Sequence, residues 1–241
     1  MIPLLVTRDS SRYKTAATLY NRLVIVSLAP LLASGVLCAS SVIPDLLDEK
    51  IILAGPWAYI GILAGVVIGG LMHEFGHAAA CIEYGGRVME IGIMLDSKPG
   101  AYTLMDHTMI RRRLRTIQAF AAGIEVNAEL ACAALAVCVL KPEWATFFAE
   151  FGLINAEYAL INLLFIDGLD GMAIMGMILG DEFALDNALT MLEERKLNGM
   201  WRVRGVNGSA RVTAAYLLGA TKLFWPILIF VNIAMVLGVI L

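Results

Sequence analysis

The feature that most constrains the fold is a stretch without charged residues, residues 51–72, that runs directly into a cluster of ionisable side chains. A run of this length and composition predicts a helix that crosses a membrane. Its glycines would weaken an isolated helix in water, but in lipid they let neighbouring helices approach closely. We therefore expect a packed membrane helix here, extending to about Cys81. The glycines concerned are Gly61, Gly65, Gly69 and Gly70.

The ionisable cluster is His73-Glu74-Phe75-Gly76-His77, an HExxH pattern. Residues i and i+4 share one face of a helix, so His73 and His77 can bind one metal ion, with Glu74 beside it to accept a proton from water. The same pattern also occurs by chance on helices that bind no metal. Ionisable groups at membrane depth are costly unless paired or ligated, which favours a functional site.

The composition agrees with an integral membrane protein. Hydrophobic residues make up 59% of the chain and charged residues only 16%, and the mean hydropathy is +0.77; an ordinary soluble domain is far less apolar. No basic patch with interleaved aromatic residues suggests a nucleic-acid partner. The four cysteines lack a CxxC spacing and are best interpreted as small buried hydrophobes.

Further apolar segments extend this architecture along the chain. We predict an all-α polytopic membrane protein with about five to six transmembrane helices, forming a single domain over residues 1–241 with its core at 51–179. The predicted parts are a cytosolic lead-in at 1–20, a first span at 23–43 that contains Pro30, an acidic turn at 44–50, a third span ending at Leu140, a fourth span at 144–166, a cytosolic amphipathic segment and loop at 181–211, and a last span at 214–241.

Residues 86–95 and 101–104 follow the HExxH helix and have the pattern of a short, membrane-associated β-hairpin. An exposed strand edge there could hold a peptide extended through backbone hydrogen bonds. A plain connector without substrate contact is an equally good interpretation. His107, just beyond the hairpin, is interpreted as a loop residue rather than a third metal ligand.

Two carboxylates at the end of the fourth span, Asp167 and Asp170, could supply the oxygen ligand that a site with two histidines lacks. Both are candidates on spacing alone. In the third span Glu125 and Glu129 share one side of the helix, where they either form interhelical hydrogen bonds, the favoured interpretation, or line a water path.

The loops predict an orientation, because cytosolic loops of membrane proteins carry an excess of lysine and arginine. The lead-in and the loops around residues 111–115 and 195–211 are rich in these residues, whereas the turns at 44–50 and 141–143 are nearly devoid of arginine. The amino terminus is therefore expected in the cytosol. Counting spans from there places the histidines and Asp170 on the cytosolic side too.

Taken together, the motifs resemble the site-2 protease family of intramembrane zinc metalloproteases. In that family an HExxH helix is followed by a hairpin, an AAGPxxN motif and an NxxPxxxLDG motif. Here the second motif is present at residues 121–127 with Ile124 in place of the proline, and the third at 162–171 with Phe165 in place of the proline. The register of the third motif selects Asp170 over Asp167.

The resemblance covers residues 51–179 and implies a minimal member without a PDZ or CBS domain. It implies Zn²⁺ held by His73, His77 and Asp170, Glu74 as the general base, and Asn162 either positioning the substrate or forming an interhelical hydrogen bond. The expected partners are the lipid bilayer and a membrane-bound or membrane-associated protein or precursor peptide, such as a regulator, pheromone or bacteriocin. The oligomeric state is not indicated.

Two alternatives stay open. A membrane metallopeptidase of the prenyl-protein-processing kind also carries HExxH near a membrane, but it needs a downstream glutamate as third ligand. A non-catalytic membrane protein that binds or transports metal could use the same histidines, although a mere binding site does not need Glu74.

Overall fold

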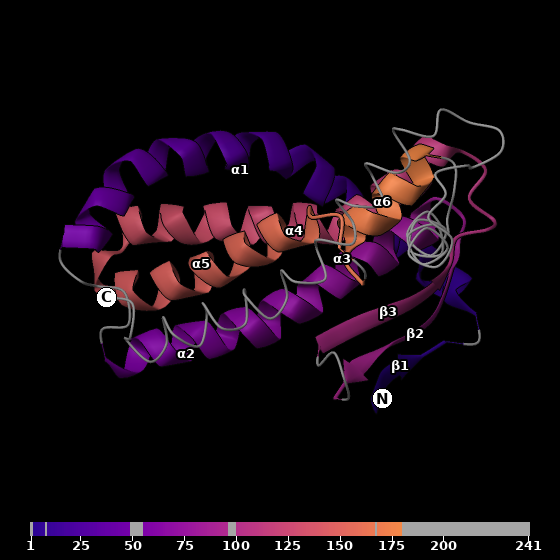
Figure 1. Cartoon of the computed structure of the whole chain (residues 1–241), viewed down its shortest axis with the longest axis horizontal. Helices are drawn as coiled ribbons and strands as arrows, with labels where there is room; N and C mark the ends of the chain where they lie inside the picture. Colours follow the sequence, from indigo (N-terminus) through magenta and orange to yellow (C-terminus); the bar gives the residue numbers. More distant parts are fainter. Residues whose placement is uncertain (1, 8, 49–54, 96–99, 167, 180–241) are drawn as a thin grey trace, which may run out of the picture. The chain divides into compact units, whose positions relative to one another are not determined.

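The computed structural model of the chain describes residues 2–7, 9–48, 55–95, 100–166 and 168–179. These residues are mostly helical, with one small sheet (Figure 1). The elements are β1 (Ile2–Val6), a 3₁₀ turn (Ser10–Tyr13), α1 (Lys14–Asp48), α2 (Pro56–Ala64), a π-helical turn (Gly65–Gly69), α3 (Gly70–Glu83), β2 (Arg87–Met94), β3 (Gly100–Asp106), α4 (Arg113–Leu140), a second 3₁₀ turn (Pro142–Trp144), α5 (Ala145–Asn162) and α6 (Asp170–Leu179).

The chain forms two compact units, Met1–Asn162 and Leu163–Leu241. The described part of the second unit is a short turn followed by α6. The single domain predicted above stays a prediction. The predicted amphipathic segment at 181–211 and last span at 214–241 lie outside the described residues.

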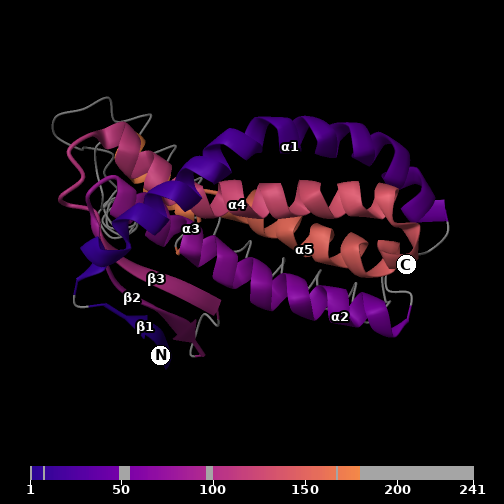
Figure 2. The same cartoon turned by 180° about the vertical axis from the view of Figure 1, so that it is seen from behind.

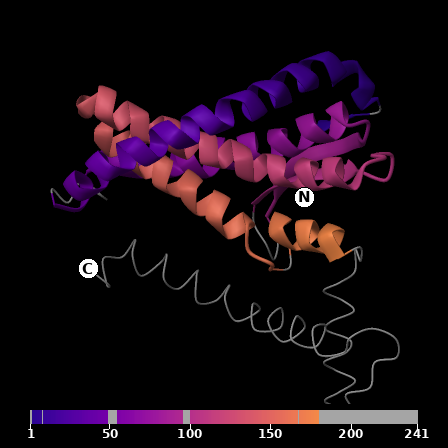
Figure 3. The same cartoon turned by 90° about the horizontal axis from the view of Figure 1, so that it is seen from above.

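The first predicted span is confirmed as a helix long and apolar enough to cross a membrane, and this helix is longer than expected. Helix α1 runs through Pro30 and continues through Pro44 to Asp48, so the predicted turn at 44–50 is wrong over residues 44–48. Proline removes one intrahelical hydrogen bond, and membrane helices tolerate that loss where neighbours compensate for it. Figure 2 shows α1 beside α4, and Figure 3 shows that the two helices cross at an angle.

The predicted second span is a continuous helical rod made of α2, the π-helical turn and α3. Its glycines pack against α5, as the prediction of close helix approach requires. A Cβ built on Gly65 would lie 2.8 Å from the Cβ of Ile154, and one built on Gly69 would lie 2.5 Å from Asn155 Oδ1. A larger residue at either position would have to displace the side chain of Ile154 or of Asn155.

The rod ends where the predicted glycine pair lies. Helix α3 stops at Glu83, and Gly85 adopts a φ of 94° that disfavours any residue with a Cβ. Gly86 lies directly over Cys81, whose Sγ would be 2.5 Å from an added Cβ. The chain therefore turns sharply and starts β2 beside the helix it has just left.

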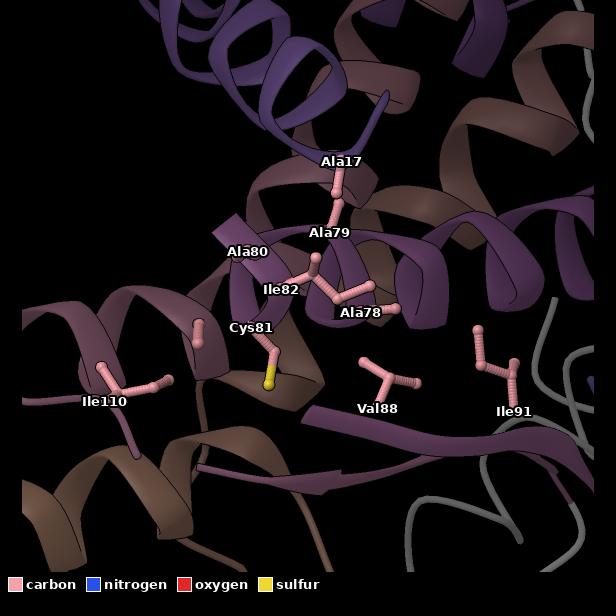
Figure 4. Packing of buried hydrophobic residues seen from close by; sticks show 11 residues of the cluster. Ala17, Ala78, Ala79, Ala80, Cys81, Ile82, Val88, Ile91 and Ile110 are labelled. Atoms are coloured by element: carbon pink, nitrogen blue, oxygen red, sulfur yellow. The ribbon is translucent and has the colours of Figure 1, made fainter. Parts of the chain in front are cut away.

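The predicted hairpin is confirmed as β2 and β3, but the sheet has a third strand. The order is β1-β2-β3 with both pairs antiparallel, and Leu5, Ile91 and Thr103 are in register across it. Strand β1 lies within residues 1–20, for which the sequence predicted a cytosolic lead-in but no strand. Val88 and Ile91 of β2 point toward α3 and pack with its alanines, and Cys81 lies between the helix and the sheet (Figure 4).

Three helices in the described part of the chain are long and apolar enough to cross a membrane, over Ser10–Ala39, Pro56–Glu83 and Arg113–Leu140. Helix α5 is not one of them, and it ends at Asn162, earlier than the predicted span at 144–166. Its embedded polar residues lower its hydropathy; they are Glu150, Asn155, Glu157 and Asn162. The prediction of a helical membrane protein agrees with these three helices, whereas the number of five to six spans stays a prediction.

Candidate metal centre

Helix α3 presents His73 and His77 on one face, as the i and i+4 spacing predicts. Both imidazoles are buried, with only 6% and 4% of their surface exposed. The rings meet edge to face, with centroids 4.6 Å apart and an interplanar angle of 84°. Helix α4 covers this face of α3, so the two rings are enclosed between helices rather than exposed to solvent or lipid.

The Nδ1 atom of each ring is held by an oxygen of α4. His77 Nδ1 lies 2.9 Å from the carbonyl oxygen of Ala119, and His73 Nδ1 lies 2.5 Å from Asn127 Oδ1. A carbonyl oxygen only accepts, so His77 carries its proton on Nδ1. The amide of Asn127 is oriented by its nitrogen, which donates to the carbonyl oxygen of Gly69 at 3.2 Å. Its oxygen therefore accepts from His73, which also carries its proton on Nδ1.

This protonation pattern leaves the Nε2 atoms as the nitrogens of the two rings that can bind a metal ion. His73 Nε2 and His77 Nε2 are 3.0 Å apart. With the protons on Nδ1, both Nε2 atoms direct lone pairs into the same small space, an arrangement that a shared cation relieves. Histidines that bind a metal almost always donate the other ring N–H to an oxygen in this way. The donor chemistry of the pair thus fits a metal ion.

Gly123 of α4 provides the space in front of the pair. A Cβ built on Gly123 would lie 2.5 Å from His77 Nε2 and 2.7 Å from His73 Nε2. Any side chain here would occupy the space on which the two lone pairs converge. The glycine of the AAGxxxN sequence is therefore explained by the histidines and not only by the approach of the helices.

Asp170 joins the two histidines in a group that could hold a metal ion. One ligand atom from each of the three residues lies within 4.8 Å of the others. Asp170 is the first residue of α6, and the turn before it contains Gly168, whose φ of 86° disfavours any residue with a Cβ. A Cβ on Gly171 would meet the carbonyl oxygen of Leu164 at 2.5 Å, so the local backbone requires glycine directly after Asp170.

The backbone of Glu74 is tied to the hairpin. The Thr103 hydroxyl of β3 donates to the carbonyl oxygen of Glu74 at 3.0 Å. Glu74 is half-buried, whereas the next residue, Phe75, is exposed. Strand β3 is therefore fastened to α3 at the residue that was predicted as the general base.

Asn162 lies at the end of α5, and its amide nitrogen donates to the carbonyl oxygen of Tyr158 in the same helix, at 3.0 Å. This bond is intrahelical, so the interhelical hydrogen bond expected as the alternative to a substrate role is not the one that this nitrogen makes. Asp167 lies outside the described residues. His107 is not in the metal-binding group; its ring packs edge to face with Phe120.

The favoured interpretation of the acidic residues in the third span is confirmed for one of them. Ser27 of α1 donates to Glu129 at 2.8 Å, an interhelical hydrogen bond between α1 and α4. Glu125 is partly buried on the same helix, and its role stays open. All four cysteines are free, and Cys81 packs beneath Gly86 as a small buried side chain.

Two groups of the sheet region, outside the membrane-spanning helices, have shifted pKa values. The side chain and backbone N–H of Thr108 donate to Asp106 at 2.6 and 3.0 Å and lower the pKa of this carboxyl group. Tyr102 lies across Gly92 and donates to Glu90, which raises the pKa of the phenol. Both pairs fasten the sheet region rather than reaching toward the histidines.

Asn127 and Ala119 were not predicted as partners of the histidines. Metal-binding histidines usually donate the second ring N–H to an oxygen, so oxygen partners for both rings could be expected. Asn127 also belongs to the second motif. Only the packing of α4 on α3 shows that the partners are the Asn127 side chain and the Ala119 carbonyl. Comparison of the sequence with protein-family models and with curated proteins gave no match.

Proposed function

We propose that this chain is a polytopic membrane zinc endopeptidase of the site-2 protease type. Its reaction would be hydrolysis of a peptide bond in a membrane-bound or membrane-associated protein or precursor peptide. The observation that carries the proposal is the pair of buried Nε2 atoms, 3.0 Å apart, whose rings are both held in the Nδ1–H form. Asp170, which groups with this pair, would supply the third ligand.

His73, His77 and Asp170 would hold the ion through two imidazole nitrogens and one carboxylate oxygen. This donor set, with three protein ligands, is characteristic of catalytic zinc and keeps one coordination position for chemistry. When bound, zinc supplies Lewis-acid polarisation of the scissile carbonyl and activation of water. Asn127 and Ala119 keep both imidazoles in the tautomer that binds a cation.

Glu74 is assigned the proton transfers. Its carboxylate oxygen accepts the proton of the attacking water and passes it to the nitrogen of the leaving amine. A site that only binds or transports metal needs no such residue, so Glu74 favours the hydrolase over the non-catalytic alternative. Asn162 is assigned no step, because its amide nitrogen already donates to Tyr158 and would have to leave that bond to reach a substrate carbonyl.

Strand β3 is the proposed place for the substrate backbone. A helical substrate hides its carbonyl groups in hydrogen bonds and has to unwind before it can be cleaved. An edge strand can accept the unwound segment through backbone hydrogen bonds. The Thr103 bond to Glu74 supports this assignment, since it fixes β3 close to the proposed base. We further propose that the amino terminus and the site face the cytosol of a multi-pass protein in the cell membrane, following the distribution of lysine and arginine.

The experiment compares the membrane peptides of cells that produce the wild-type protein with those of cells that produce Glu74→Gln. Glutamine has the shape of glutamate but cannot take up the proton. We expect truncated membrane peptides only with the wild type, and their disappearance when a permeant zinc chelator is added. Identical peptide patterns with the two proteins, at equal protein levels, would contradict the proposal and favour a metal carrier.

A further inference from the structure

Two buried asparagines connect α5 to the histidine site. Asn127 of α4 and Asn155 of α5 are both 0% exposed. Asn127 Nδ2 donates to Asn155 Oδ1 at 2.9 Å, and Asn155 Nδ2 donates to the carbonyl oxygen of Phe151 at 2.8 Å. Asn155 belongs to none of the sequence motifs that suggested the function. Buried amides have to be hydrogen-bonded, which makes the direction of each bond informative.

The chain of bonds has a fixed direction because it begins at backbone carbonyls. Phe151 can only accept, so Asn155 turns its nitrogen toward Phe151 and its oxygen toward Asn127. Asn127 must then present its nitrogen to that oxygen, and its own oxygen is left to face His73 Nδ1. The Asn155 amide, together with the Gly69 carbonyl oxygen, thus sets through Asn127 which nitrogen of His73 carries the proton.

The opposite orientation of the Asn127 amide is disfavoured by two acceptors. If the Asn127 amide turned over, its oxygen would face Asn155 Oδ1 and the carbonyl oxygen of Gly69, both of which only accept. No solvent reaches the amide to compensate, since the side chain is fully buried. Gly69 contributes the space as well, because a Cβ there would lie 2.5 Å from Asn155 Oδ1. The network therefore has one low-energy arrangement.

From these contacts we infer that Asn155 is a positioning residue for His73, acting through Asn127, and that it keeps the His73 Nε2 lone pair available for the metal. The inference rests on the proposed function only where it takes His73 as a metal ligand. The tautomer of His73 is a property of the metal-free protein and is tested without any ion.

The perturbation is Asn155→Leu in the full chain, purified in detergent. Leucine matches asparagine in shape but offers no acceptor to Asn127, so one of the two bonds that orient the Asn127 amide is lost. Loss of such an outer partner typically weakens metal affinity about 10- to 100-fold. Because Gly69 still holds the Asn127 nitrogen, we expect the lower end, about tenfold weaker zinc binding.

Asn21→Leu is the matched control. Asn21 of α1 is also buried and makes two side-chain hydrogen bonds, to Glu83 at 2.5 Å and to the Tyr84 hydroxyl at 3.3 Å. Its replacement removes similar bonds from the same unit, but none of them reaches a histidine. We expect Asn21→Leu to reduce thermal stability while leaving zinc affinity and the His73 tautomer unchanged.

Two measurements test the inference, the tautomer of His73 and the affinity for zinc. The chain has three histidines, so the ¹⁵N shifts of the labelled rings can be assigned with single His variants, and they report which nitrogen is protonated in metal-free protein. The wild type is expected to show His73 as Nδ1–H, and Asn155→Leu to show a mixture of tautomers. Zinc affinity is measured in parallel by competition with a chelator.

A double-mutant cycle tests whether Asn155 acts on His73 through Asn127. Asn127→Asp keeps an oxygen that accepts from His73 Nδ1 but cannot donate to Asn155, so the link is cut at its centre. In that background Asn155→Leu should bring no further loss of zinc affinity. Equal losses in both backgrounds would overturn the inference, because Asn155 would then act by another route.

The inference is also overturned if Asn155→Leu keeps the wild-type tautomer and affinity, or if Asn21→Leu weakens zinc binding to the same degree. Should Asn155→Leu not fold, Asn155→Ala removes the same acceptor and is judged by the same outcomes. Absence of zinc binding by the wild type would contradict the proposed function, yet the tautomer shift would still decide on the connection between Asn155 and His73.

Discussion

Gly123 offers the sharpest test of how tightly the structure encloses the candidate metal centre. In Gly123→Ala the new methyl group would lie 2.5 Å from His77 Nε2, which is 0.9 Å closer than the 3.4 Å at which ordinary van der Waals contact begins. The rings have little freedom to give way, because their Nδ1 atoms are held by Ala119 and Asn127. One of the ring nitrogens, or helix α4, has to move by most of that distance.

A displacement of this size is large for a metal ligand, since metal–ligand distances tolerate only about 0.2 Å. We expect Gly123→Ala to weaken zinc binding at least about a hundredfold, which corresponds to about 2.8 kcal/mol. The assay is competition with a chelator of known affinity on detergent-purified protein. The methyl group is small and does not change the charge of the site, so the effect isolates the loss of space.

Gly152→Ala is the control for this experiment. A Cβ on Gly152 would lie 2.9 Å from the Cβ of Ala134, so this change also overpacks an interface of α4, but at a place without histidines. It should reduce stability and leave zinc affinity at the wild-type level. Wild-type affinity in a folded Gly123→Ala protein would refute the geometry described for the centre, as would equal losses in the two variants.

Three further predictions concern residues around the centre. Glu74→Gln should keep the wild-type zinc content and lower peptide hydrolysis by about 10²- to 10⁴-fold, the usual contribution of a general base; loss of zinc together with activity would speak against this role. Thr103→Val removes the hydrogen bond from β3 to the Glu74 carbonyl and should cost about 1 kcal/mol of stability without loss of zinc, measured by thermal unfolding and metal analysis. Thr108→Val should raise the pKa of Asp106 toward its ordinary value of 3.8. Because a lowered carboxyl pKa stabilises the fold above the ordinary pKa and this contribution is lost as the pH falls through the folded-state value, the destabilisation by Thr108→Val should be present at pH 7 and vanish in acid; a pH-independent difference between the two unfolding midpoints would contradict this.

The parts of the fold that were predictable depend on local patterns. The run at residues 51–72 and the HExxH spacing together predicted a long helix with both histidines on one face, and the glycine pair at 85–86 predicted its end. The hairpin followed from turn residues between two short apolar runs. In each case the signal lies within a few residues of the structure it determines.

Other features depend on partners far along the chain. Strand β1 forms because β2 offers an edge to residues 2–6, and no pattern within those residues predicts a strand. Helix α1 passes through Pro44, where the local sequence Pro-Asp predicted a turn. The pairing of β1 with β2 is a tertiary contact that the local sequence does not encode.

The candidate site divides in the same way. His73 and His77 were predictable from spacing, and Asp170 from the register of a motif, whereas the oxygens that set the histidine tautomers come from α4 and depend on which turn of α4 faces α3. Asn155 acts one helix further away, and its side chain gave no local signal beyond being a polar residue in an apolar helix. Such outer partners become visible only when the helices are placed together.

The central claim is a zinc ion held by two histidines and one aspartate, and the most direct measurement is the metal content of detergent-purified protein. The wild type is compared with Asp170→Ala and with Asp167→Ala. The account predicts about one zinc per chain in the wild type and in Asp167→Ala, and a clear loss in Asp170→Ala, because Asp170 groups with His73 and His77 and the register of the third motif selects Asp170 over Asp167. Wild-type protein without zinc, or zinc content that does not depend on Asp170, would contradict it.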